Sequence, residues 1–176
     1  MFPKNTWYVA CSADEIDVKP LGRTICNERI VFYRGPEGKA VALEDFCPHR
    51  GAPLSLGTVC EGNLVCGYHG LAMGCDGKTV SMPGQRVRGF PPIRSFPIQE
   101  RYGFVWIWPG EQEKADPALI PHMEWHDNPD WAYGGGVFDE ADPNPKLEEI
   151  RLNSPESKRA LQASYDMYVR DQSVPV

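Results

Sequence analysis

Two short cysteine and histidine clusters are the part of this 176-residue sequence whose residue types and spacing point to chemistry. The first cluster contains Cys47 and His49, and the second contains Cys66 and His69. Their pattern is C-x-H, then sixteen residues, then C-x-x-H. Thiolates and imidazoles are common transition-metal ligands, so two of each predict a metal centre built from two loops.

Two kinds of centre suit these ligands, a tetrahedral zinc ion or a two-iron, two-sulfide cluster with mixed ligation. Zinc sites usually take two cysteines from one knuckle and two histidines from one helix. Here each loop supplies one of each. In a two-iron cluster the cysteines of both loops hold one iron and the histidines hold the other. The order favours the cluster, with zinc, or cysteines and histidines that only pack in a core, as the alternatives.

Short β-strands separated by turn residues are predicted around these loops. We expect strands at residues 6–10, 23–25, 30–33, 40–43, 96–99 and 102–108. Turns are expected at residues 27–28 and, around Gly35-Pro36-Glu37-Gly38, at 35–38. The sequence therefore predicts a mainly β fold of antiparallel sheets, in which loops rich in Gly and Pro present the metal ligands.

The composition excludes several classes of protein. Gly and Pro together number 34 of 176 residues, which argues for many turns and against a helical bundle. The net charge is −6 with no concentrated basic stripe, so nucleic acid is not an expected partner. No apolar run is long enough to span a membrane, and the opening residues lack a signal-peptide core, so a cytoplasmic location is expected. The six cysteines are then better read as thiols or metal ligands than as disulfides.

Residues 1–110 resemble a Rieske domain, because both loops match the C-x-H and C-x-x-H motif of that family within a β context. The similar stretches are Thr6–Ala10, Asp45–Leu54, Cys66–Leu71, and the run from Phe96 to Trp108 followed by Pro109-Gly110. Respiratory Rieske proteins carry an extra cysteine in each loop, joined as a disulfide. Here Ala52 and Tyr68 occupy those positions, so the disulfide cannot form. The loops are instead similar to those of Rieske non-haem iron aromatic oxygenases, most of all the vanillate O-demethylase type of oxygenase component.

The resemblance implies a set of roles. Cys47 and Cys66 would hold the buried iron of a [2Fe-2S] cluster, while His49 and His69 would hold the outer iron through one ring nitrogen. Their other nitrogen would face solvent or a partner. Electrons would come from a flavin and iron–sulfur reductase or from a ferredoxin, and the family also implies a homotrimer. Gly51, Gly67 and Gly70 would let backbone N–H groups approach the cluster sulfides.

The family also needs a mononuclear Fe(II) held by two histidines and a carboxylate. Its motif, of the type Asp/Asn-x-x-His-x-x-x-x-His, does not occur in this sequence. His122 and His126 are the remaining histidines, and a polar surface or packing role is favoured for them over a metal role. We therefore expect this chain to hold the cluster but not to oxygenate by itself. An aromatic substrate is expected only where a catalytic domain is supplied.

The sequence suggests three segments. Residues 1–110 are expected to form the Rieske domain, and residues 111–138 a linker or the start of the oxygenase catalytic region. Residues 139–176 are expected to form an atypical tail, apparently truncated or shifted relative to the family, with a short helix ending near residue 170. The alternatives for the whole chain are a stand-alone Rieske-type ferredoxin and, less favoured, a zinc-binding interaction module.

Several other side chains carry weaker expectations. Buried structural roles are expected for the four remaining cysteines, Cys11, Cys26, Cys60 and Cys75. A solvated surface is favoured for the basic residues near the loops, with a landing surface for an acidic electron donor as the alternative; they are Arg50, Lys78, Arg86 and Arg88. Tyr68 is expected either to pack over the cluster or to donate a hydrogen bond that tunes its potential.

Overall fold

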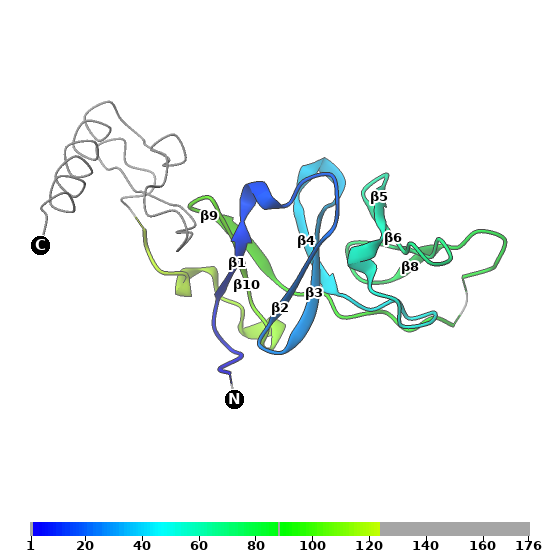
Figure 1. Ribbon diagram of the computed structural model, residues 1–176. Helices are drawn as coiled ribbons and strands as arrows, with labels where there is room; N and C mark the ends of the chain where they lie inside the picture. The colour runs from blue at the N-terminus through cyan, green and yellow to red at the C-terminus, as the bar shows by residue number, and fades with distance from the viewer. Residues whose placement is uncertain (1, 88, 124–176) are drawn as a thin grey trace, which may run out of the picture. The chain divides into compact units, whose positions relative to one another are not determined.

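The computed structural model describes residues 2–87 and 89–123 (Figure 1). Within them, ten strands form three antiparallel sheets. The first sheet has the order β1-β10-β9, and its strands are β1 (Tyr8–Ser12), β10 (Phe104–Ile107) and β9 (Ile98–Arg101). The second has the order β2-β3-β4, with β2 (Leu21–Ile25), β3 (Glu28–Arg34) and β4 (Ala40–Glu44).

The third sheet carries the surroundings of the predicted site. Its order is β5-β6-β7-β8, with β5 (Thr58–Cys60), β6 (Asn63–Val65), β7 (Ala72–Met73) and β8 (Thr79–Ser81). Short 3-10 helices connect the strands: η1 (Ala13–Glu15), η2 (Pro36–Gly38), η3 (Leu54–Leu56), η4 (Gln112–Lys114) and η5 (Pro117–Leu119). The predicted mainly β architecture of antiparallel sheets is confirmed.

Strand β3 joins two hydrophobic cores, since alternate side chains of a strand point to opposite faces of its sheet. Val31 and Tyr33 belong to one core, together with Cys47, Cys66 and other buried residues next to the third sheet. Ile30 and Phe32 belong to the other core, which β1 and β10 complete. All four β3 residues have no exposed surface. The second sheet, β2-β3-β4, which we call the middle sheet, is thus covered on both faces. This makes it a rigid support for the loop that follows β4.

The turn between β2 and β3 lies one residue earlier than predicted. Cys26 and Asn27 both have positive φ, at 52° and 65°, and they connect the paired residues Ile25 and Glu28. Two central residues with positive φ match the right-handed twist of a hairpin. The hairpin predicted around residues 35–38 is confirmed by the pairing of β3 with β4.

The first strand begins later than predicted, at Tyr8 instead of Thr6. Trp7 leaves the strand because its ring packs edge-on against Trp108 at 5.5 Å between centroids, and its indole N–H donates to the carbonyl of Asp116 at 2.7 Å. Residues 1–121 form one compact unit. The tail at residues 139–176, with its predicted helix, lies outside the described residues, as does most of the 111–138 segment.

Candidate metal centre

The two predicted ligand loops fold as matching turns. In the first, the Cys47 N–H donates to the Ala52 carbonyl at 2.9 Å and the Gly51 N–H donates back to the Cys47 carbonyl at 2.8 Å. In the second, the Cys66 N–H donates to the Leu71 carbonyl at 2.9 Å and the Gly70 N–H donates back to the Cys66 carbonyl at 3.0 Å. One loop follows β4 and the other follows β6. Each strand therefore ends by delivering a cysteine at the start of a closed turn.

Glycine closes each turn because the backbone there is left-handed. Gly51 has a φ of 71° and Gly70 has a φ of 73°, a region that costs side-chain-bearing residues about 1–2 kcal/mol. Gly67 has a different role, since a Cβ at that position would lie 2.9 Å from the Leu56 carbonyl oxygen. The second loop thus rests directly on the backbone that follows the first loop.

The four side chains meet in like pairs. The Cys47 and Cys66 thiols are neighbours that interact electrostatically, and the His49 and His69 rings lie 4.7 Å apart between centroids. No three Cys, His, Asp or Glu side chains of the described residues are grouped so that they could hold one metal ion. Thiol beside thiol and imidazole beside imidazole is the arrangement in which each pair serves a different iron.

The two pairs differ in exposure. Cys47 and Cys66 are each 2% exposed, so the sulfur end of the site lies in the hydrophobic core. His49 is half-buried and His69 is exposed. The Nδ1 atom of His49 is buried and has no hydrogen-bond partner. An orphaned buried ring nitrogen is costly unless something coordinates it, which fits a metal ligand.

Burial raises the pKa of the Cys47 thiol above its ordinary value. The N–H groups of His49 and Arg50 donate to this sulfur and oppose the rise, while the neighbouring Cys66 thiol adds to it. Amide donors aimed at a sulfur stabilise its thiolate form, so the loop is prepared for the charge that a metal-bound cysteine carries.

Two aromatic rings border the histidines. Tyr68 stacks on His69 at 3.8 Å between centroids, with an angle of 33° between the planes, and is 62% exposed. Phe90 packs edge-on against His49 at 5.7 Å. The ring contact of Tyr68 is thus with His69, one of the predicted ligands. Phe90 carried no sequence signal, because it lies outside both motifs and reaches the site only through the fold.

The remaining cysteines follow their predicted roles only in part. Cys11 is buried and Cys26 is half-buried, but Cys60 and Cys75 are exposed, so the prediction of buried structural thiols is wrong for these two. Cys60 ends the outer strand β5, and Cys75 lies in the turn after β7. Sequence cannot separate such positions, since a cysteine near an apolar run may face either side of a strand.

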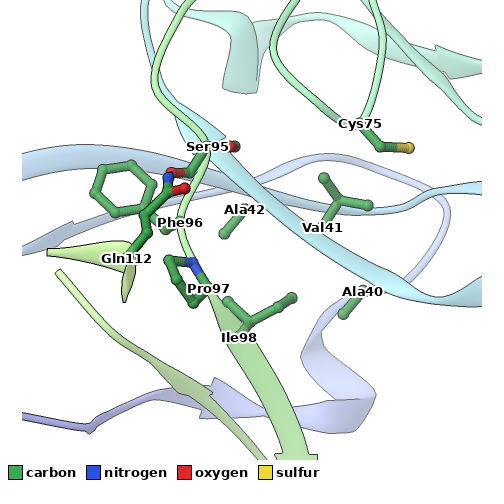
Figure 2. Close-up of a pocket in the computed structure, with 9 residues that line it drawn as sticks. All are labelled: Ala40, Val41, Ala42, Cys75, Ser95, Phe96, Pro97, Ile98 and Gln112. Carbon is green, nitrogen blue, oxygen red and sulfur yellow. The ribbon is translucent and has the colours of Figure 1, made fainter. Parts of the chain in front are cut away.

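A shallow pocket of about 290 Å³ lies over β4 and the segment before β9 (Figure 2). Apolar residues share its lining with Cys75, Ser95 and Gln112, and the Gln112 side chain donates to the Ser95 carbonyl at 2.5 Å. The pocket has no charged lining residue, and none of its lining residues belongs to the ligand loops. It therefore lacks the convergent polar groups of a catalytic site.

Residues 6–97 match the family model of the Rieske [2Fe-2S] domain, which spans both ligand loops. The chain belongs to the Rieske [2Fe-2S] domain family. Its cofactor is the Rieske [2Fe-2S] cluster, a carrier of single electrons.

Curated relatives place this Rieske domain among oxygenase components. The chain is 72% identical over 138 residues to a vanillate O-demethylase oxygenase subunit of Pseudomonas sp. (strain HR199 / DSM 7063), covering 78% of this chain and 39% of that protein. It is 44% identical over 149 residues to the dicamba O-demethylase oxygenase component of Stenotrophomonas maltophilia, covering 83% of this chain and 43% of that protein. The chain thus spans about two-fifths of the length of these relatives.

Solved structures agree with this family. A crystal structure of dicamba monooxygenase bound to dicamba superposes with a TM-score of 0.70 at 43% sequence identity, covering 76% of this chain and 41% of that chain. Within the described residues, no helix is long and apolar enough to cross a membrane.

Proposed function

We propose that Cys47, Cys66, His49 and His69 are the four protein ligands of the Rieske cluster. Like side chains meet in pairs, with the sulfur pair in the core and the imidazole pair at the surface, and this is the observation that carries the assignment. When bound, the cluster supplies one-electron chemistry. His49 would coordinate through Nδ1, the buried ring nitrogen that lacks a partner.

The surrounding residues then give the site a direction. The core around the cysteines excludes water from the sulfur end. At the opposite end, the exposed His69 ring and the Tyr68 ring stacked on it are in reach of a protein partner. Electrons would arrive and leave at this histidine face.

For the donor, we propose a flavin and iron–sulfur reductase or a ferredoxin. Residues 46–93, which carry both loops, contain four Lys or Arg and only two Asp or Glu, in a chain with a net charge of −6. Lys78 is paired with Asp76, whereas the ion pairs of the described residues include neither Arg50 nor Arg86. A basic excess in the segment that carries both loops suits an acidic donor, because complementary charge speeds association.

For the acceptor, we propose a mononuclear iron of the same kind of oxygenase, supplied by residues other than those described. The alignment with the vanillate O-demethylase subunit covers 138 residues and so extends beyond the Rieske match at residues 6–97. This supports an oxygenase component over a stand-alone ferredoxin. We propose that the whole protein demethylates an aromatic methyl ether, and that it works as a homotrimer in which the cluster serves the iron of a neighbouring subunit.

The assignment is tested by metal analysis and spectroscopy of the purified full chain. We expect a red-brown protein with iron and acid-labile sulfide in equal amounts and a Rieske-type paramagnetic signal after reduction. Cys66→Ser and His49→Cys are expected to abolish or change the visible spectrum, while Cys75→Ser, at an exposed position, is the matched control that leaves it unchanged. A colourless protein with stoichiometric zinc would refute the cluster, and an unchanged Cys66→Ser spectrum would refute the ligand set.

A further inference from the structure

Asp45 is the charged residue that the structure buries, and its carboxylate bonds to a single partner residue. Among the described residues it is the only charged side chain that is buried, at 6% exposure. Its Oδ1 accepts the Ser55 N–H and its Oδ2 accepts the Ser55 hydroxyl, both at 2.7 Å. These two bonds join the ends of the first ligand loop, since Cys47 and His49 lie between the bonded residues.

The segment that begins at Ser55 also touches the second loop on both sides of its cysteine. A Cβ on Gly67, directly after Cys66, would lie 2.9 Å from the Leu56 carbonyl oxygen. A Cβ on Gly57 would lie 2.1 Å from the carbonyl oxygen of Val65, directly before Cys66. We name residues 55–57 the strut, because their backbone lies against the second loop while Ser55 is bonded to the start of the first.

Strand β2 leaves space for this arrangement. A Cβ on Gly22 would lie 2.9 Å from the Ser55 Cβ and 3.7 Å from Asp45 Oδ2. The Asp45 N–H is also bonded to the Arg29 carbonyl of β3 at 2.9 Å. The carboxylate is thus held between the middle sheet and the strut, at the junction of the two loops.

We propose that Asp45 is a positioning residue that sets the separation of the two ligand loops through Ser55 and the strut. The proposal rests on the proposed ligand set. Without the two bonds, the first loop is no longer tied to the backbone on which the second loop rests. The side chains of Cys47 and His49 then lose their fixed positions relative to those of the second loop. Partners that orient metal ligands typically change metal affinity about 10–100-fold when they are removed. The buried negative charge also favours the oxidised, more positive state of a nearby redox centre.

The test uses Asp45→Ala, Asp45→Asn and Ser55→Ala in the full chain, with Asp116→Asn as the matched control. The Asp116 carboxylate accepts the Ala118 backbone N–H at 2.9 Å. This bond is of the same kind as the one between Asp45 and the Ser55 N–H, but it lies outside the ligand loops. The measurements are iron per chain, the rate at which the visible absorbance is lost under a chelator, and the midpoint potential of reduction.

The Asp45→Ala chain is expected to lose the cluster roughly 10-fold faster than the parent chain, or faster still. The Ser55→Ala chain keeps one of the two bonds, so its rate of cluster loss should rise by a smaller factor. Asp45→Asn can still accept the Ser55 N–H and can donate to its hydroxyl, so it should retain the cluster with a midpoint potential shifted upward. Asp116→Asn should match the parent chain in all three measurements. A role in stability alone would not move the potential of a fully loaded Asp45→Asn variant.

Two outcomes overturn the inference while leaving the proposed function intact. One is an Asp45→Ala chain that keeps its cluster as long as the parent does. The other, which decides the matter even if Asp45→Ala fails to fold, is a Ser55→Ala chain that keeps its cluster as long as the parent does. By contrast, absence of iron from the parent chain itself refutes the ligand set on which the inference rests.

Discussion

Replacing Gly57 by alanine should destabilise the protein through a backbone clash. Gly57 has a φ of −89° and a ψ of −153°, so alanine meets no left-handed backbone there. Its Cβ, however, would lie 2.1 Å from the Val65 carbonyl oxygen and 3.0 Å from that of Leu54. A carbon and a carbonyl oxygen normally approach no closer than about 3.3 Å, so the two backbone segments must separate by more than about 1 Å.

The strands oppose that separation. Val65 pairs with Thr58 on one side and with Ala72 on the other, and it directly precedes Cys66. Overpacking typically costs about 1–3 kcal/mol, and we expect the upper end, about 3 kcal/mol, because backbone must move on both sides. For a unit of this size, each kcal/mol lowers the melting temperature by about 4 °C, which gives a decrease of about 12 °C.

The assay is the apparent melting temperature of the cluster-loaded full chain at one scan rate, together with iron per chain. Gly38→Ala is the control, since Gly38 has a φ of 72° and nothing within 4 Å of its Cβ position. That variant should lose only about 1 kcal/mol of its free energy of unfolding, which is the cost of placing alanine in a left-handed backbone conformation. If Gly57→Ala melts no lower than Gly38→Ala, the close approach of the strut to the second loop is refuted.

Three further predictions concern charge and thiol chemistry. Burial, followed by the charge of a nearby carboxylate, raises the pKa of Cys11 from 9.0 to about 11, so the folded chain keeps a proton that the unfolded chain loses. Stability should therefore decrease as the pH rises from 9 to 11, less steeply in Cys11→Ala, as chemical denaturation at each pH would show. Arg34→Lys should lower the free energy of unfolding by about 1–2 kcal/mol in the same assay, since Arg34 donates to both Glu100 oxygens at 2.8 Å. A loss no larger than that of Arg23→Lys would contradict this. Alkylating the exposed Cys60 and Cys75 should leave the visible spectrum unchanged, and bleaching would show that one of them supports the cluster.

The turns of the two predicted ligand loops depend on local sequence. Each loop combines a cysteine, a histidine and a glycine within five residues, and the turn that these residues form closes on itself by the two bonds between residues 47–52 and 66–71. The hairpin at residues 35–38 was predictable for the same reason. The turn at Cys26 and Asn27 was misplaced by one residue, since a cysteine with positive φ carries no turn signal.

The sequence alone predicts the chemistry of the site and determined the family, because ligand type and spacing within a turn are properties of a short stretch of chain. Only the tertiary structure decided which side chains meet, which histidine is exposed, and what holds the loops in register. The ring of Phe90 packs against His49, and the carboxylate of Asp45 bonds to Ser55. Gly22, from a separate strand, leaves the space that Ser55 occupies. Such contacts depend on how whole sheets pack, and no local pattern of residues specifies that packing.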